Sequence, residues 1–350
     1  MSKTGASAPL HSSTTPAPAQ ARMRRVRPLR HSLVVAAVAV ACATFVSLLR
    51  PTPARATEHR APALPLSKAS PDSALASLLD TLRGNSGKLR ARFLSPRHVA
   101  GLPVLRELFG EPVAQRAGVY TAALQNGPFH FITMRPFTDK VQGRIGSYRI
   151  GTFPAERRSA PATLTLASGA AAASVRGQPE GFLEVTLANQ DTRISEHFRL
   201  RDFLTKDQHA VWPKYLVLRE PLLDKLELVL SELRAMGVTA NQLKVMSGFR
   251  TPQYNAQGVG AGGRASDSRH QYGDAADVYV VNGSKDWMSD LNGDGRVDTR
   301  DARVLAQAAE RVEQRHPELV GGVGIYKATS AHGPFVHIDV RGVRARWGEW

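Results

Sequence analysis

The stretch SRHQYGDAAD, residues 268–277, places two metal-binding side chains, His270 and Asp277, on either side of a turn of small residues. A second stretch, FVHIDV at residues 335–340, adds His337. Imidazole nitrogen and carboxylate oxygen both bind zinc, and three such ligands leave the fourth tetrahedral position open for water. An open position distinguishes a hydrolytic zinc from a structural one. The sequence therefore predicts one catalytic zinc ion held by His270, Asp277 and His337.

Apolar and polar residues alternate along 335–340, as in a strand with one buried face. His337 and Asp339 share the polar face, while valine and isoleucine occupy the other. A lone histidine on a strand is usually structural. Here, however, the turn between His270 and Asp277 allows both residues to reach the same ion as His337, and the pattern favours a metal site.

The chain has 350 residues, which is long enough for two compact units with tails. Its formal net charge is +16. Residues 1–56 contain eight basic residues and no acidic residue, so half of the excess charge belongs to this segment. The remainder is mildly basic, which suits a polyanionic cell envelope or nucleic acid. Since the sequence contains no recognisable nucleic-acid-binding motif, we expect no nucleic-acid partner.

Residues 33–49 form an uncharged, apolar run of 17 residues that follows a cluster of arginines. The sequence ARA at 54–56 matches the pattern that signal peptidases cut. Residues 33–56 are therefore a cleaved signal peptide or a membrane anchor that spans at 33–49, and Arg24-Arg25 also permits a twin-arginine route. Each alternative predicts an exported protein in the periplasm or cell envelope. Cys42, the single cysteine, lies in the apolar run, so the exported part binds metals through nitrogen and oxygen.

Composition and hydrophobic periodicity divide the chain into five segments. They are a disordered basic tail at 1–32, the signal or anchor at 33–56, a linker at 57–112 with a short helix at 71–82, a small β-rich domain at 113–190 and a C-terminal domain at 191–350. In the C-terminal domain we predict helices at 221–236 and 301–315 and strands at 242–246, 277–281 and 335–340. Helices and strands without a regular alternation indicate an α+β fold.

Three motifs carry a family resemblance: S-x-H-x-x-G-x-A-x-D at 268–277, His-x-Asp at 337–339 and SGFRTP at 247–252. With them, residues 191–347 resemble the M15 family of zinc D-Ala-D-Ala carboxypeptidases and related peptidoglycan peptidases. The resemblance implies a zinc D-Ala-D-Ala-peptidase-like fold for the C-terminal domain and does not include the β-rich domain. It also implies a metallopeptidase that cleaves peptidoglycan peptides next to a D-amino acid or within a cross-link.

The resemblance assigns the zinc to His270, Asp277 and His337, and gives Arg250 the role of holding a polarised carbonyl or a substrate carboxylate. Zinc lowers the pKa of bound water to about 7, and a guanidinium stabilises a developing oxyanion. Many family members place a general base three residues before the last histidine ligand, or a second histidine two residues before it. Pro334 and Phe335 occupy these positions, and neither transfers a proton.

Asp339 is the substitute candidate for the general base, and His332 is the second. Asp339 can instead orient a zinc ligand through a hydrogen bond. The zinc site therefore leaves two functions open: a peptidase, and a non-catalytic zinc-containing module that binds the cell wall. A calcium-dependent interaction protein is a third hypothesis.

Residues 290–301 follow the spacing of a calcium-binding loop, with glycine at position 6, where such a loop turns sharply. The sequence resembles the EF-hand-like loop of dockerin repeats. We predict a calcium ion whose oxygen ligands come from Asp290, Asn292, Asp294, the Arg296 carbonyl, Asp298 and Asp301. A single loop without a repeat favours local structural support over docking to a scaffold protein.

Overall fold

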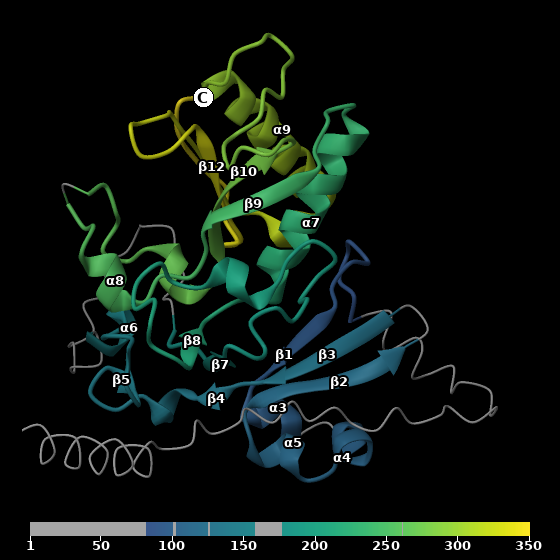
Figure 1. Ribbon diagram of the computed structural model, residues 1–350, viewed down its shortest axis with the longest axis vertical. Coiled ribbons are helices and arrows are strands. Elements are labelled where there is room, and N and C mark those ends of the chain that lie inside the picture. The colour runs from purple at the N-terminus through teal and green to yellow at the C-terminus, as the bar shows by residue number, and fades with distance from the viewer. Residues whose placement is uncertain (1–81, 101–102, 125–126, 158–176, 261) are drawn as a thin grey trace, which may run out of the picture. The chain divides into compact units, whose positions relative to one another are not determined.

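The computed structural model describes residues 82–100, 103–124, 127–157, 177–260 and 262–350 (Figure 1). The expected tail at 1–32, the signal or anchor at 33–56 and all but the last residue of the expected helix at 71–82 lie outside these ranges. Within the ranges, no helix is both long and apolar enough to cross a membrane.

The described residues form a mixed α+β structure, which confirms the expected fold class. Its largest sheet has five strands in the order β13-β11-β12-β10-β9. Figure 1 labels β12, β10 and β9 of this sheet. The strands are β9 (Gln242–Ser247), β10 (Ala275–Val281), β11 (Gly322–Tyr326), β12 (Phe335–Asp339) and β13 (Ala345–Gly348). Neighbouring strands are antiparallel except for β11 and β13, which are parallel.

Two long helices, α7 (Glu220–Ala235) and α9 (Thr299–Arg315), pack against each other, and α9 contacts β10, β11 and β12. Valine and isoleucine side chains of these strands, among them Val336 and Ile338, belong to the main hydrophobic core. The predicted helices and strands of this region are therefore present, with ends that differ by at most two residues.

Strand register places one residue from each strand in a row across the sheet. Asp277 pairs with Ser247 on one side and with His337 on the other, His337 pairs with Gly324, and Gly324 pairs with Trp347. Residues that pair directly across strands point to the same face of a sheet. Two predicted metal ligands thus lie side by side on the face that does not carry Val336 and Ile338.

A second sheet lies in the N-terminal part of the described chain. Strand β1 (Ala91–Leu94) runs parallel to β3 (Gly127–Thr133), and β2 (Gly118–Leu124) is antiparallel to β3. Three short helices that the sequence analysis did not predict contribute to a separate small core with this sheet: α3 (Pro96–Ala100), α4 (Pro103–Phe109) and α5 (Pro112–Gln115).

Shorter strands connect the expected β-rich region to the C-terminal region. Strand β7 (Gly181–Val185) pairs with β4 (Arg135–Pro136) and with β8 (Lys214–Leu216), and β5 (Arg144–Ile145) pairs with β6 (Tyr148–Arg149). The main core contains side chains from both sides of residue 190, including Phe182 and Leu216. Smaller elements among the described residues include the helix α6 (Pro154–Arg157) and the 3-10 helices η1 (Phe137–Asp139), η2 (Leu200–Phe203) and η4 (Pro317–Leu319).

His130 on β3 makes stability depend on pH. Its Nδ1 lies 2.9 Å from the Thr121 hydroxyl, and burial lowers the pKa of His130 to about 4. The unfolded chain, with a histidine pKa of about 6.5, binds a proton first as the pH falls. We expect a stability loss of at most about 3 kcal/mol between pH 6.5 and pH 4. Urea unfolding of wild type and His130→Gln at pH 7 and pH 4.5 measures it.

Other acidic groups contribute to acid unfolding, so the difference between the two proteins is the relevant quantity. His130→Gln is expected to remove part of the pH dependence. An identical acid sensitivity in wild type and His130→Gln contradicts the assignment.

Candidate metal centre

His270, Asp277 and His337 converge at one point, as predicted. His270 lies on the 3-10 helix η3 (Arg269–Tyr272), Asp277 on β10 and His337 on β12. Gly273 ends η3 with a positive φ of 67°, and a Cβ at this position would lie 2.3 Å from the Val217 carbonyl oxygen. Only glycine fits such a position, which explains the turn that brings His270 next to the sheet.

The three candidate ligand atoms form a nearly equilateral triangle. His270 Nε2 lies 3.2 Å from His337 Nδ1 and 3.2 Å from Asp277 Oδ1, and His337 Nδ1 lies 2.9 Å from Asp277 Oδ1. A tetrahedral ion with bonds of about 2.0 Å separates its ligands by about 3.3 Å. All three residues are buried. This geometry fits a metal ion bound by two imidazoles and one carboxylate.

Each histidine is oriented by an acceptor on its other ring nitrogen. His270 Nδ1 donates to the Gly248 carbonyl at 2.7 Å, and His337 Nε2 donates to Asp339 Oδ2 at 3.2 Å. These hydrogen bonds fix the tautomers that leave His270 Nε2 and His337 Nδ1 free to bind a metal. The SGFRTP motif and the His-x-Asp motif therefore each supply one orienting acceptor.

The charges around the triad favour an ionised carboxylate. Burial raises the pKa of Asp277, but the charges of His270 and Arg250 outweigh burial and hold it well below its usual range. Burial lowers the pKa of His270. Burial also lowers the pKa of His337, yet the hydrogen bonds with Asp277 and Asp339 outweigh it, and this pKa is raised. A metal ion competes with protons for these ring nitrogens, so metal affinity is expected to fall as the pH falls.

Arg250 reaches the triad from the segment between β9 and the short helix α8 (Pro252–Ala256). Its Nε donates to Ser247 Oγ at 2.8 Å, and its Nη2 forms an ion pair with Asp277 Oδ2. The backbone N–H of Arg250 donates to the His270 carbonyl at 3.1 Å. Contacts with described residues use two of the five guanidinium N–H groups, so the others can bind a ligand.

Asp339 is buried, and its carboxylate accepts hydrogen bonds on both oxygens. The donors include the Gly322 N–H at 2.7 Å, the Arg341 N–H at 3.0 Å and the Arg341 guanidinium. Burial raises the pKa of Asp339, but the hydrogen bonds from His337 and Arg341 outweigh it and hold the pKa far below its usual range. A carboxylate so strongly stabilised in its ionised form is a poor proton acceptor. The contacts favour the orienting role for Asp339.

His332, the second candidate base, lies on the loop before β12. Its Nδ1 contacts the Gly333 carbonyl at 2.9 Å, and its ring packs edge-on against Phe335 with centroids 5.0 Å apart. It belongs to the surroundings of β12 and is not among the three converging ligand atoms.

Trp347 lies beside the candidate metal centre, although no motif in the sequence pointed to it. Its ring packs against the His337 ring, with centroids 5.1 Å apart. A Cβ on Gly324 would lie 2.3 Å from Trp347 Nε1, so the glycine makes room for the indole. The sequence GGVGIY at 321–326 could have indicated this close packing, because glycines that alternate with apolar residues in a strand leave room for another group.

Comparison with known proteins leaves the family unassigned. No family model, curated protein or solved structure matches the chain. The resemblance to M15 peptidases therefore stays a prediction.

The predicted calcium loop uses its carboxylates within the loop itself. Asp290 accepts the N–H groups of Gly293 and Gly295, each at 2.8 Å, and Asp301 accepts the Leu291 N–H at 2.7 Å. Asp298 and Asp301 form the capping box of α9. Among the described residues, the converging group of possible ligands is the triad and not this loop. Calcium binding stays a prediction.

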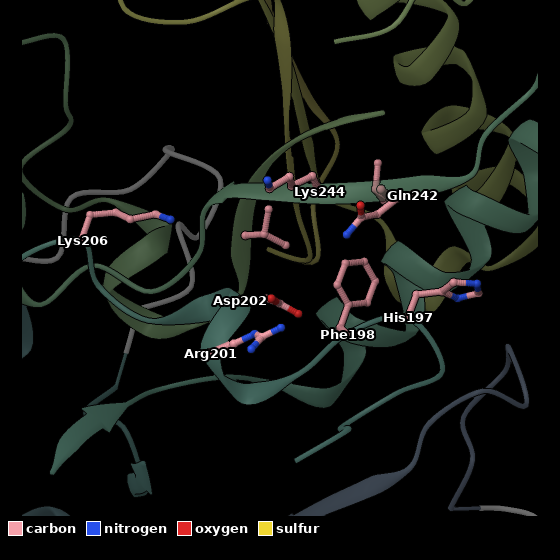
Figure 2. Close-up of a pocket in the computed structure, with 9 residues that line it drawn as sticks. His197, Phe198, Arg201, Asp202, Lys206, Gln242 and Lys244 are labelled. Atoms are coloured by element: carbon pink, nitrogen blue, oxygen red, sulfur yellow. The ribbon is translucent and has the colours of Figure 1, made fainter. Parts of the chain in front are cut away.

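A separate cavity of about 210 Å³ lies between η2 and the edge strand β9 (Figure 2). Figure 2 shows the basic side chains of Arg201, Lys206 and Lys244 around it, together with Asp202. Arg201 pairs with Asp191 at 2.5 Å and Lys244 with Asp286 at 2.5 Å. None of the three candidate metal ligands lines this cavity.

Proposed function

We propose that this chain is an exported zinc peptidase that hydrolyses peptidoglycan stem or cross-link peptides at bonds of D-amino acids. The observation that carries the proposal is the triangle of donor atoms from His270, Asp277 and His337. Two imidazoles and one carboxylate are a ligand set of catalytic zinc, because they leave one position for water or substrate. The apolar run at 33–49 supports delivery to the cell envelope, where such peptides occur.

Zinc in this site supplies a Lewis acid and an activated water. The protein contributes preorganisation: the Gly248 carbonyl and Asp339 hold the two imidazoles, so little reorganisation accompanies substrate binding. Arg250 adds a fixed positive charge whose remaining N–H groups can bind a substrate carbonyl or carboxylate. The same proposal includes a calcium ion in the loop 290–301, where it supports α9 structurally.

The second candidate is a non-catalytic zinc-containing module that binds the cell wall. Two observations favour it. Hydrogen bonds engage both oxygens of the Asp339 carboxylate, and Pro334 and Phe335 occupy the positions where the M15 family places its base. A site that binds zinc without a proton acceptor binds ligands but turns them over slowly.

Digestion of cross-linked muropeptides by the purified protein, followed by mass spectrometry, tests the proposal. Wild type is expected to release shorter peptides. Arg250→Ala is expected to lower kcat by about 10²- to 10³-fold, since it removes charge stabilisation of the transition state. Zinc content is measured in the same samples, so that loss of metal is distinguished from loss of the guanidinium.

Arg344→Ala is the matched control, because Arg344 is an exposed arginine paired with Glu310. Its turnover is expected to equal that of wild type. If wild type and Arg344→Ala bind intact peptidoglycan equally and wild type releases no product, the peptidase is refuted and the binding module is supported.

A further inference from the structure

Tyr326, the last residue of β11, lies on the metal-bearing face of the sheet. It pairs with Phe335, and the two rings stack with centroids 4.6 Å apart and an interplanar angle of 4°. Phe335 and His337 are two residues apart on β12, so their side chains share a face. Tyr326 therefore stands one row along the sheet from His337, on the same side as the candidate ligands.

Trp347 connects Tyr326 to the metal centre. Its indole N–H donates a hydrogen bond to the Tyr326 hydroxyl oxygen at 2.8 Å, while its ring packs against His337. Indole is a donor only, so the phenol oxygen has to be the acceptor of this bond. The phenolic proton takes no part in this bond.

Within the part of the chain that the structure describes, no group accepts the Tyr326 proton. The residue is 38% exposed, so its hydroxyl can meet a molecule from solution. Burial raises the pKa of Tyr326, the Trp347 hydrogen bond lowers it, and the charges of Asp277 and Arg250 act on it in opposite directions. The pKa is raised overall, so the hydroxyl keeps its proton at neutral pH and remains a donor.

We propose that the Tyr326 hydroxyl donates a hydrogen bond to a ligand oxygen at the metal centre, with Trp347 holding the hydroxyl in place. The ligand is an oxygen that carries negative charge, such as the carbonyl oxygen of a peptide bond under attack or the oxygen of a hydroxamate. This inference rests on the proposed function, and adds a second fixed donor to Arg250. A preorganised donor toward developing negative charge stabilises the transition state more than the substrate.

Tyr326→Phe tests the proposal, because it removes the hydroxyl and keeps the ring that stacks on Phe335. The first measurement is the Kd of acetohydroxamate for the zinc-loaded protein by calorimetry. We expect about 10-fold weaker binding in Tyr326→Phe, the effect of one hydrogen bond to a charged group. The second is turnover of muropeptides, with kcat lowered by about 10²-fold and KM unchanged.

Tyr215→Phe is the matched control, since Tyr215 lies on β8, in a different sheet from β11, and its hydroxyl lies 3.3 Å from Glu184 on β7. It is expected to bind acetohydroxamate as wild type does. Zinc content and circular dichroism are compared in all three proteins.

An equal Kd in wild type and Tyr326→Phe at equal zinc content overturns the proposal, as does an absence of acetohydroxamate binding by wild type. A higher Kd for acetohydroxamate in Tyr326→Phe supports the donor role of Tyr326 even where wild type cleaves no muropeptide. In that case the peptidase function fails, and the donor role of Tyr326 stands.

Discussion

His337→Ala is expected to lose its bound zinc and to lower muropeptide turnover by at least about 10³-fold, because metal catalysis is worth several kcal/mol. The substitution removes one corner of the triangle formed with His270 and Asp277. Two protein ligands then remain for an ion that requires three. Metal analysis and mass spectrometry of muropeptide digests measure both effects.

Zinc also stabilises a folded protein that binds it, so added zinc is expected to raise the Tm of wild type and not of His337→Ala. His209→Ala is the control, since His209 is an exposed histidine outside the triad. One zinc per chain together with full turnover in His337→Ala would show that the metal centre has been misassigned.

Lys225→Met is expected to destabilise the protein by about 3 kcal/mol, because it breaks a buried network of charges. Lys225 on α7 is 0% exposed, and its Nζ donates to Glu313 Oε1 at 2.6 Å and to the Asp339 carbonyl at 2.7 Å. Arg346 remains paired with Glu313 after the substitution, which places the expected effect at the lower end of the range for buried pairs. Urea unfolding with the folded baseline checked by circular dichroism measures it.

Lys244→Met supplies the comparison. Lys244 pairs with Asp286 where both side chains are exposed, and such pairs contribute about 0 to 1 kcal/mol. Equal stabilities for Lys225→Met and wild type would mean that the network beneath β12 does not hold α7 and α9 to the sheet.

The convergence of the three candidate ligands could be predicted from the sequence because their chemistry and their local turn lie in two short motifs. The hydrophobic face of α7 and the alternation in β12 likewise depend on residues near each other in the chain. The row that joins Asp277 to Gly324 and Trp347 depends on register between distant strands. Periodicity carries no information about register between such strands, so Trp347 and Tyr326 were missed.

Two other differences between the sequence-based predictions and the structure have local causes. The helices α3, α4 and α5 contain four to seven residues each, too few for a helical period to stand out. Alternation placed Asp339 on the same face as His337, but it could not show that Arg341 and the Gly322 N–H would engage its carboxylate. The choice between a base and an orienting group therefore needed the folded structure.

The most direct test of the metal centre is X-ray absorption at the zinc edge on the purified protein. We expect one zinc per chain, with two histidine nitrogens and oxygen ligands at about 2.0 to 2.2 Å. We also expect that Asp277→Ala changes this spectrum or loses the ion. Zinc that is absent from wild type purified in zinc-containing buffer, or a spectrum that is identical in Asp277→Ala, would contradict the account.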